Sequence, residues 1–116
     1  MDISHLLAVV PVSDHEASVR WYENLLGRPA DSRPMEALAD WHVTETGWLQ
    51  VFRDPSRAGT TAVNLAVGSI DQAAGTIRAR GITPDEPVEA SAGVRLLPVR
   101  DPDGNVVTLI EGPRRD

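Results

Sequence analysis

The sequence contains no cysteine, few aromatic residues and fewer basic than acidic side chains. Without cysteine the chain forms no disulfide, has no thiol nucleophile and offers no thiolate to a metal. Acidic residues outnumber Lys and Arg by 17 to 11, giving a net charge of −6. This balance argues against a nucleic-acid partner, because binding a phosphate backbone requires a basic face.

The chain also lacks long apolar runs and a basic N-terminal segment. No run approaches the roughly 18–20 apolar residues of a membrane span, so we expect no membrane partner. Nothing at the start of the sequence has the form of a signal peptide, and a cytoplasmic location is the expectation. The 116 residues, 41% of them hydrophobic, fit one globular domain covering residues 1–116.

Signals for strands and helices occur twice in the same order. Apolar runs predict strands, and helical spacing predicts two helices that end at Gly27 and Gly81, which are 81 − 27 = 54 residues apart. A repeat of this length indicates an internal duplication, with modules at about residues 1–55 and 61–112. The predicted elements are strands at 3–12, 38–44, 48–52, 62–67, 94–99 and 106–111, helices at 14–26 and 70–80, and either a strand or an extended piece at 82–89.

Three segments carry a resemblance to a known family. They are residues 12–27, the second predicted helix ending in Gly81, and the turn at residues 101–105 (Asp-Pro-Asp-Gly-Asn) before the last apolar strand. Together with the repeat, they resemble the vicinal oxygen chelate superfamily of glyoxalases, bleomycin-resistance proteins and dioxygenases. The resemblance implies an α+β fold of two βαβββ modules, whose curled mixed sheets form a cup with the helices outside. It also implies a ligand inside the cup and a homodimer.

Metal-dependent members of the superfamily hold a divalent cation on the first and fourth strands of each module. Counted from the motifs, the resemblance places those positions at Leu7, Gln50, Ala62 and Thr108. Leucine and alanine cannot ligate a metal, and zinc, nickel, manganese and iron prefer imidazole or carboxylate. We therefore expect no metal and no other cofactor.

Alternation along the predicted strands selects residues that face the cup. His5, near the cup mouth, and His42, in a strand, are candidates for a general base, or are strand residues with ordinary hydrogen bonds. Trp41 and Trp48 flank one hairpin, where they form either a flat wall for a planar ligand or a core pair across the hairpin. His15 is expected to face solvent. The candidate ligand-binding residues are Trp41, Trp48, Gln50, Phe52, Asn64, Thr108, His5 and His42.

These observations favour a metal-free protein that holds a planar or cationic small molecule in the cup, as the bleomycin-resistance branch does by sequestration. The acidic balance suits a basic ligand. An enzyme is the alternative: a lyase, isomerase or dioxygenase-like protein whose metal site is absent, or shifted to His5, His42 and Glu45. A third possibility is an accessory domain whose own side chains fill the cup. The sequence leaves open whether the cup lies within one chain or across a dimer.

Overall fold

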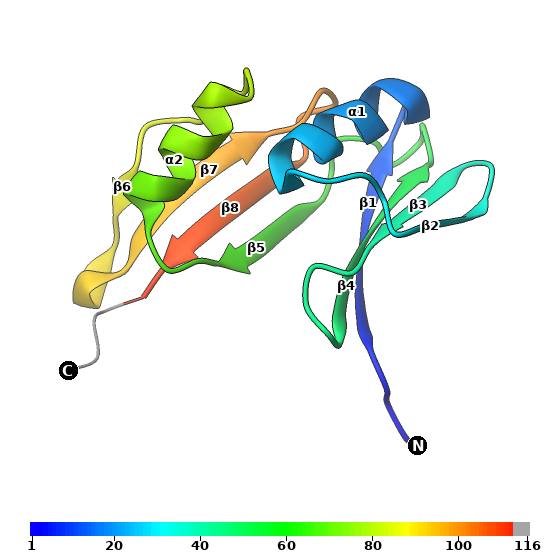
Figure 1. Ribbon diagram of the computed structural model, residues 1–116, viewed down its shortest axis with the longest axis horizontal. Coiled ribbons are helices and arrows are strands. Elements are labelled where there is room, and N and C mark those ends of the chain that lie inside the picture. The colour runs from blue at the N-terminus through cyan, green and yellow to red at the C-terminus, as the bar shows by residue number, and fades with distance from the viewer. Residues whose placement is uncertain (113–116) are drawn as a thin grey trace.

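The computed structural model describes residues 1–112 as two four-stranded sheets, each accompanied by one helix (Figure 1). Each sheet is mixed, with one parallel pair beside antiparallel pairs. The arrangement is α+β with two βαβββ modules, which confirms the predicted fold class.

In module one the strand order is β1-β4-β3-β2. Its elements are β1 (Leu6–Val12), α1 (His15–Leu26), β2 (Ser32–Met35), β3 (Leu38–Trp41) and β4 (Gly47–Arg53).

In module two the strand order is β5-β8-β7-β6, the same topology. Its elements are β5 (Ala62–Ala66), α2 (Ile70–Ala79), β6 (Val88–Glu89), the single 3₁₀ turn η1 (Ser91–Gly93), β7 (Arg95–Arg100) and β8 (Val106–Glu111).

The helices begin and end at the residues that the sequence indicates. The Asp14 carboxylate accepts a hydrogen bond of 3.1 Å from the Ala17 amide, and Ser69 caps α2 in the same way. Gly27 follows α1 with φ of 77°, in the left-handed region where glycine carries no steric cost. No helix among residues 1–112 is long and apolar enough to span a membrane.

The structure departs most from the sequence pattern at β2 and β6, which lie at corresponding edges of the two sheets. β2 forms in a stretch that has two prolines and no strand signal, and all four of its residues are exposed. Pro34 fits there because an edge strand need not donate from every residue. In the stretch 82–89 only the last two residues form a strand. β2 and β6 therefore form through pairing with β3 and β7 rather than through their own propensity.

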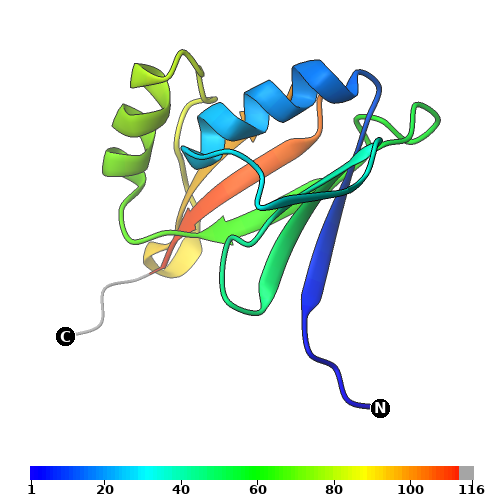
Figure 2. The same ribbon diagram turned by 45° about the vertical axis from the view of Figure 1, so that its right-hand side comes forward.

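Both helices lie on the same side of the sheets (Figures 1 and 2). The core lies between the helices and the sheet faces beneath them, where α1 contributes Val19, Tyr22 and Leu25. His15 also turns inward. It is 7% exposed and its Nε2–H donates to the Val51 carbonyl at 3.2 Å, so the expectation of a solvent-facing His15 is wrong. The first turn of α1 packs on β4, and that contact buries the ring.

Candidate ligand-binding site

Strand register divides each sheet into a helix-facing side and an opposite side, which we call the cup face. In module one, Leu7 lies beside Trp48, and Val9 beside Gln50. Residues paired across strands share a face, and Leu49 and Val51 are buried on the helix side. The side chains of Trp48, Gln50 and Phe52 therefore point to the cup face, which agrees with the alternation.

In module two, Asn64 pairs with Thr108 and Ala62 pairs with Val106. These residues lie on the cup face, since the intervening Val107 and Leu109 are buried on the helix side. Asn64 is exposed and Thr108 is half-buried. The structure thus places two of the candidate residues, Asn64 and Thr108, side by side.

One chain leaves both cup faces open. Leu7 and Val9 on β1 are 44% and 47% exposed, although both are large apolar side chains. On β5, Ala62, Asn64 and Ala66 are exposed as well. In a single chain, the cup face of each module is therefore exposed along its edge strand, β1 or β5.

Three aromatic rings stand together on the cup face of module one. The rings of His42 and Trp48 are stacked, with centroids 3.7 Å apart and planes 17° from parallel. The His5 ring lies 4.5 Å from Trp48, tilted by 53°. We call His5, Trp48 and His42 the aromatic stack. Within residues 1–112 the buried His42 Nε2 and Trp48 Nε1 have no hydrogen-bond partner.

Beside the stack lies a polar pair that includes a residue absent from the sequence candidates. Asp40, 3% exposed, accepts hydrogen bonds from the Gln50 amide at 2.9 Å and from the Ser32 hydroxyl at 3.3 Å. Asp40 pairs with Gln50 across β3 and β4, which puts both on the cup face. The signal was present in the alternation of β3, since Asp40 stands two residues before His42.

Trp41 does not belong to the cup. It is fully buried, its Nε1–H donates to the Arg28 carbonyl at 3.0 Å, and its ring lies 6.2 Å from that of Tyr22 under α1. Its partner across the hairpin is Leu49, another helix-facing residue. Trp41 and Trp48 therefore occupy opposite faces of the sheet, so they form neither a common ligand wall nor a pair across the hairpin.

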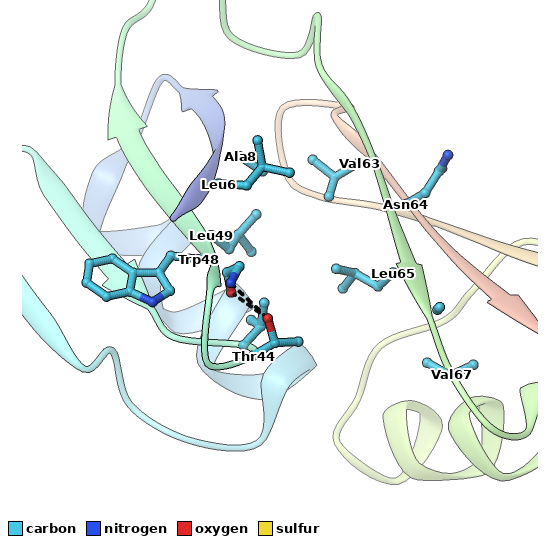
Figure 3. A pocket seen from close by; sticks show the side chains of 12 residues that line it. Leu6, Ala8, Thr44, Trp48, Leu49, Val63, Asn64, Leu65 and Val67 are labelled. Carbon is cyan, nitrogen blue, oxygen red and sulfur yellow. Dashed lines mark hydrogen bonds between the residues drawn. The ribbon is translucent and has the colours of Figure 1, made fainter. Parts of the chain in front are cut away.

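An apolar groove of about 440 Å³ separates the two modules, between β1 and β4 on one side and β5 on the other (Figure 3). Leu6 and Leu49 point into it from module one, and Val63 and Leu65 from module two. Trp48 lines the rim, and its ring turns away from the groove. The sequence did not indicate this groove, because its walls meet only through the packing of the modules.

The four counted metal positions do lie on the cup faces, but their chemistry does not suit a divalent cation. Leu7 and Ala62 carry no donor atom, and the Gln50 amide is bonded to Asp40. Across residues 1–112 no group of three or more His, Asp or Glu side chains is placed to hold a metal. The residues present therefore do not fit the metal of the metal-dependent relatives.

Comparison with known proteins places the chain in a family. The sequence profile described as a glyoxalase-like domain matches residues 7–110. The chain belongs to the glyoxalase-like family. This family lies within the glyoxalase, bleomycin-resistance and dioxygenase superfamily, which confirms the resemblance seen in the sequence.

Solved structures agree over nearly the whole glyoxalase-like chain. A glyoxalase/bleomycin resistance protein from Catenulispora acidiphila is 31% identical, with a TM-score of 0.88 over 94% of this chain and 98% of that one. TnmS3, an antibiotic binding protein from Streptomyces sp. CB03234, is 25% identical, with a TM-score of 0.77 over 97% and 98%. A lactoylglutathione lyase from Agrobacterium tumefaciens shares the fold at 16% identity, with a TM-score of 0.78 over 92% of each chain. No curated protein sequence matches the chain.

Proposed function

We propose that this glyoxalase-like chain is a metal-free binding protein that holds a planar or cationic small molecule against its cup faces. The observation that carries the proposal is the aromatic stack, a concentration of flat rings on an open sheet face, beside the buried Asp40 carboxylate and the half-buried Gln50 amide. Flat apolar walls with a few placed polar groups are typical of small-molecule sites. The antibiotic binding relative, similar over nearly its whole length, supports the same reading.

The chemistry of the site favours binding over turnover. Both candidate bases pack against Trp48: the His42 ring is stacked on it, and the His5 ring lies tilted beside it. The alternative, a lyase, isomerase or dioxygenase-like enzyme, requires a bound metal or a correctly oriented general base. Leu7 and Ala62, at two of the counted metal positions, have no side-chain donor for either role. Phe52, Asn64 and Thr108 extend the wall with groups that contact a ligand without reacting with it.

We infer that a second copy of the chain completes the cup. On the cup face of β1, Leu7 and Val9 are 44% and 47% exposed, an apolar surface that a single chain leaves uncovered. β1 and β5 are each at the edge of their sheet, with unpaired backbone groups. A homodimer in which module one of one chain faces module two of its partner would cover these surfaces.

Mass in solution tests the dimer. Wild type is expected to elute with the mass of two 12.5 kDa chains. Val9→Lys, on the uncovered cup face of β1, is expected to give the mass of one chain. Met35→Lys is the matched control, because Met35 is 54% exposed on β2 at the opposite edge of the same sheet. A monomeric wild type, or equal effects of the two substitutions, would overturn this interface.

Intrinsic fluorescence tests ligand binding. A panel of planar aromatic antibiotics, both cationic and neutral, is titrated into wild type and into Trp48→Phe, which keeps Trp21 and Trp41 as internal emitters. We expect at least one compound to change the wild-type emission and to have little effect on the emission of Trp48→Phe. If no compound changes the emission of the wild type, the proposed function is wrong. If the change persists in Trp48→Phe, the ligand lies elsewhere.

A further inference from the structure

Asp40 is a buried carboxylate without a cationic partner. It is 3% exposed, yet among residues 1–112 no basic nitrogen lies within the 4.0 Å of an ion pair. The nearby Arg28 guanidinium pairs with Asp31 at 3.2 Å. Both partners of Asp40, the Gln50 amide and the Ser32 hydroxyl, are neutral. A buried charge of this kind is costly unless a counter-charge is supplied.

The carboxylate also fixes the direction of the Gln50 side chain. A carboxylate only accepts hydrogen bonds, so Gln50 must turn its NH₂ group toward Asp40. The Gln50 Oε1 atom is left without a partner among residues 1–112 and stands on the half-buried cup face. Module one therefore has a hydrogen-bond acceptor there, Gln50 Oε1, next to the negative charge of Asp40.

We propose that Asp40 and Gln50 form an acceptor subsite that binds a protonated nitrogen of the ligand. This inference rests on the proposed function and specifies the ligand as an aromatic cation. Gln50 makes the direct contact, and Asp40 is a positioning residue that supplies charge. On the described cup face of module two, the paired residues Asn64 and Thr108 are neutral, and the Asp85 carboxylate beside β7 is already paired with Arg100 at 3.2 Å.

The spacing of the site suits such a molecule. Trp48 and Gln50 are two residues apart on β4, about 7 Å along an extended strand. A ligand whose nitrogen contacts Gln50 therefore reaches the aromatic stack with its ring system. A ring–cation ligand of this shape uses both features of the face at once, whereas a neutral ring uses only the stack.

Calorimetric titration with matched probes tests the subsite. The probes are 9-aminoacridine, which is protonated at neutral pH, uncharged acridine, and anthracene-9-carboxylate, which is an anion. Wild type is expected to bind the cation at least about tenfold more tightly than acridine. A tenfold difference corresponds to about 1.4 kcal/mol, which is a modest electrostatic contribution for a cation near a buried carboxylate. The anion is expected to bind most weakly.

Two variants separate charge from hydrogen bonding. Asp40→Asn keeps the shape and an acceptor for Gln50 but removes the charge, and we expect it to bring the cation and acridine to within about threefold of each other. Ser32→Ala removes the other partner of Asp40 and keeps the charge, so the preference for the cation is expected to persist.

Each outcome of the titrations bears on a definite claim. If wild type binds acridine as tightly as the cation, or if Asp40→Asn keeps the full preference, the acceptor subsite is wrong while ring binding in the cup stands. The wild-type comparison holds even if Asp40→Asn fails to fold. If none of the three probes binds, both the subsite and the proposed function are overturned.

Discussion

The Tyr22 hydroxyl donates a hydrogen bond of 2.9 Å to Oδ2 of Asp101, across 79 residues of sequence. Tyr22 is fully buried on α1 of module one, and Asp101 lies at the end of β7 in module two. The bond therefore joins the two modules through buried side chains.

Asp101 and Asn105 extend this connection. Oδ1 of Asp101 accepts from the amides of Asp103 and Asn105, both at 2.9 Å, which shapes the turn. The Asn105 side chain donates to the Pro11 carbonyl and to Asp101, both at 2.8 Å, and accepts from the Thr61 amide at 3.0 Å. The turn thus has a second role beyond its own backbone geometry, because it holds β1 of the other module.

Tyr22→Phe removes only the hydroxyl and leaves the buried Asp101 short of one donor. We expect the free energy of unfolding to fall by about 1.5–3 kcal/mol, the range for a hydrogen bond to a charged group. Urea denaturation followed by circular dichroism measures it. Ser56→Ala is the control, since its hydroxyl donates to Asp54 at 2.8 Å in an exposed loop, and we expect a loss below about 0.5 kcal/mol. Equal losses would contradict the role assigned to Tyr22.

Tyr22 also makes stability depend on pH in the alkaline range. Burial, and then the charge of Asp101, raise the pKa of Tyr22 well above its ordinary 10.0. The unfolded chain releases the proton near pH 10 while the folded chain retains it. Stability from this group is therefore full below pH 10 and falls by up to about 1.4 kcal/mol per pH unit above it.

Tyr22 is the single tyrosine of the chain, so its titration can be followed directly by the near-ultraviolet absorbance of tyrosinate. We expect this absorbance to appear only together with the loss of the circular dichroism of the fold. A tyrosinate signal near pH 10 from a folded protein would show that the hydroxyl is not held as described.

Two glycines with the same backbone conformation make a matched test of packing. Gly59 and Gly81 both have φ of +84°, where a side chain costs about 1–2 kcal/mol. A Cβ on Gly81 meets nothing within 4 Å, whereas one on Gly59 would overlap the backbone oxygen of Asp103. That residue accepts a hydrogen bond from the Ser13 amide at 3.0 Å, so it cannot move without loss.

We therefore expect Gly81→Ala to cost about 1–2 kcal/mol and Gly59→Ala to cost a further 1–3 kcal/mol or so, the usual range for overpacking. Thermal and urea unfolding of the two variants measure the difference. A similar cost for both would mean that the loop holding Gly59 adjusts without disturbing Asp103.

The elements that sequence predicts well are those fixed by local chemistry. Asp14 and Gly27 bound α1 through a side-chain cap and a left-handed residue, and both signals lie within a few residues of their effect. The facing of Trp48 and Gln50 follows from alternation within one strand. The repeated order of such signals was enough to indicate two βαβββ modules.

The features that sequence predicts poorly depend on register between segments. Antiparallel pairing of β3 with β4 sets Trp41 opposite Leu49, and the hairpin alone does not reveal which residues pair. The burial of His15 depends on α1 docking on β4. The second role of Asn105 depends on Pro11, 94 residues away. No local pattern carries these contacts, since each depends on how separate segments of the chain pack or pair: two lie within module one, and the third joins the modules.

His5 gives a final prediction, because its place on Trp48 is one that a planar ligand would take. His42 covers one face of Trp48, and its backbone is held by the Asp31 carboxylate and the Arg28 side chain. His5 lies before β1 in an exposed segment, and within the described residues its only side-chain hydrogen bond joins its neighbour Ser4 at 3.0 Å. A ring entering the cup therefore displaces His5 more readily than His42.

We expect His5→Ala to tighten binding of uncharged acridine by about 2- to 12-fold, the equivalent of the 0.5–1.5 kcal/mol typical of an aromatic pair that no longer has to be broken. Calorimetric titration of wild type and variant measures the change. Ser4→Ala is the control, since it removes the bond to His5 but keeps the imidazole, and its affinity should match wild type. Weaker binding by His5→Ala would show instead that the imidazole contacts the ligand, because losing a contact costs affinity whereas losing a competitor increases it.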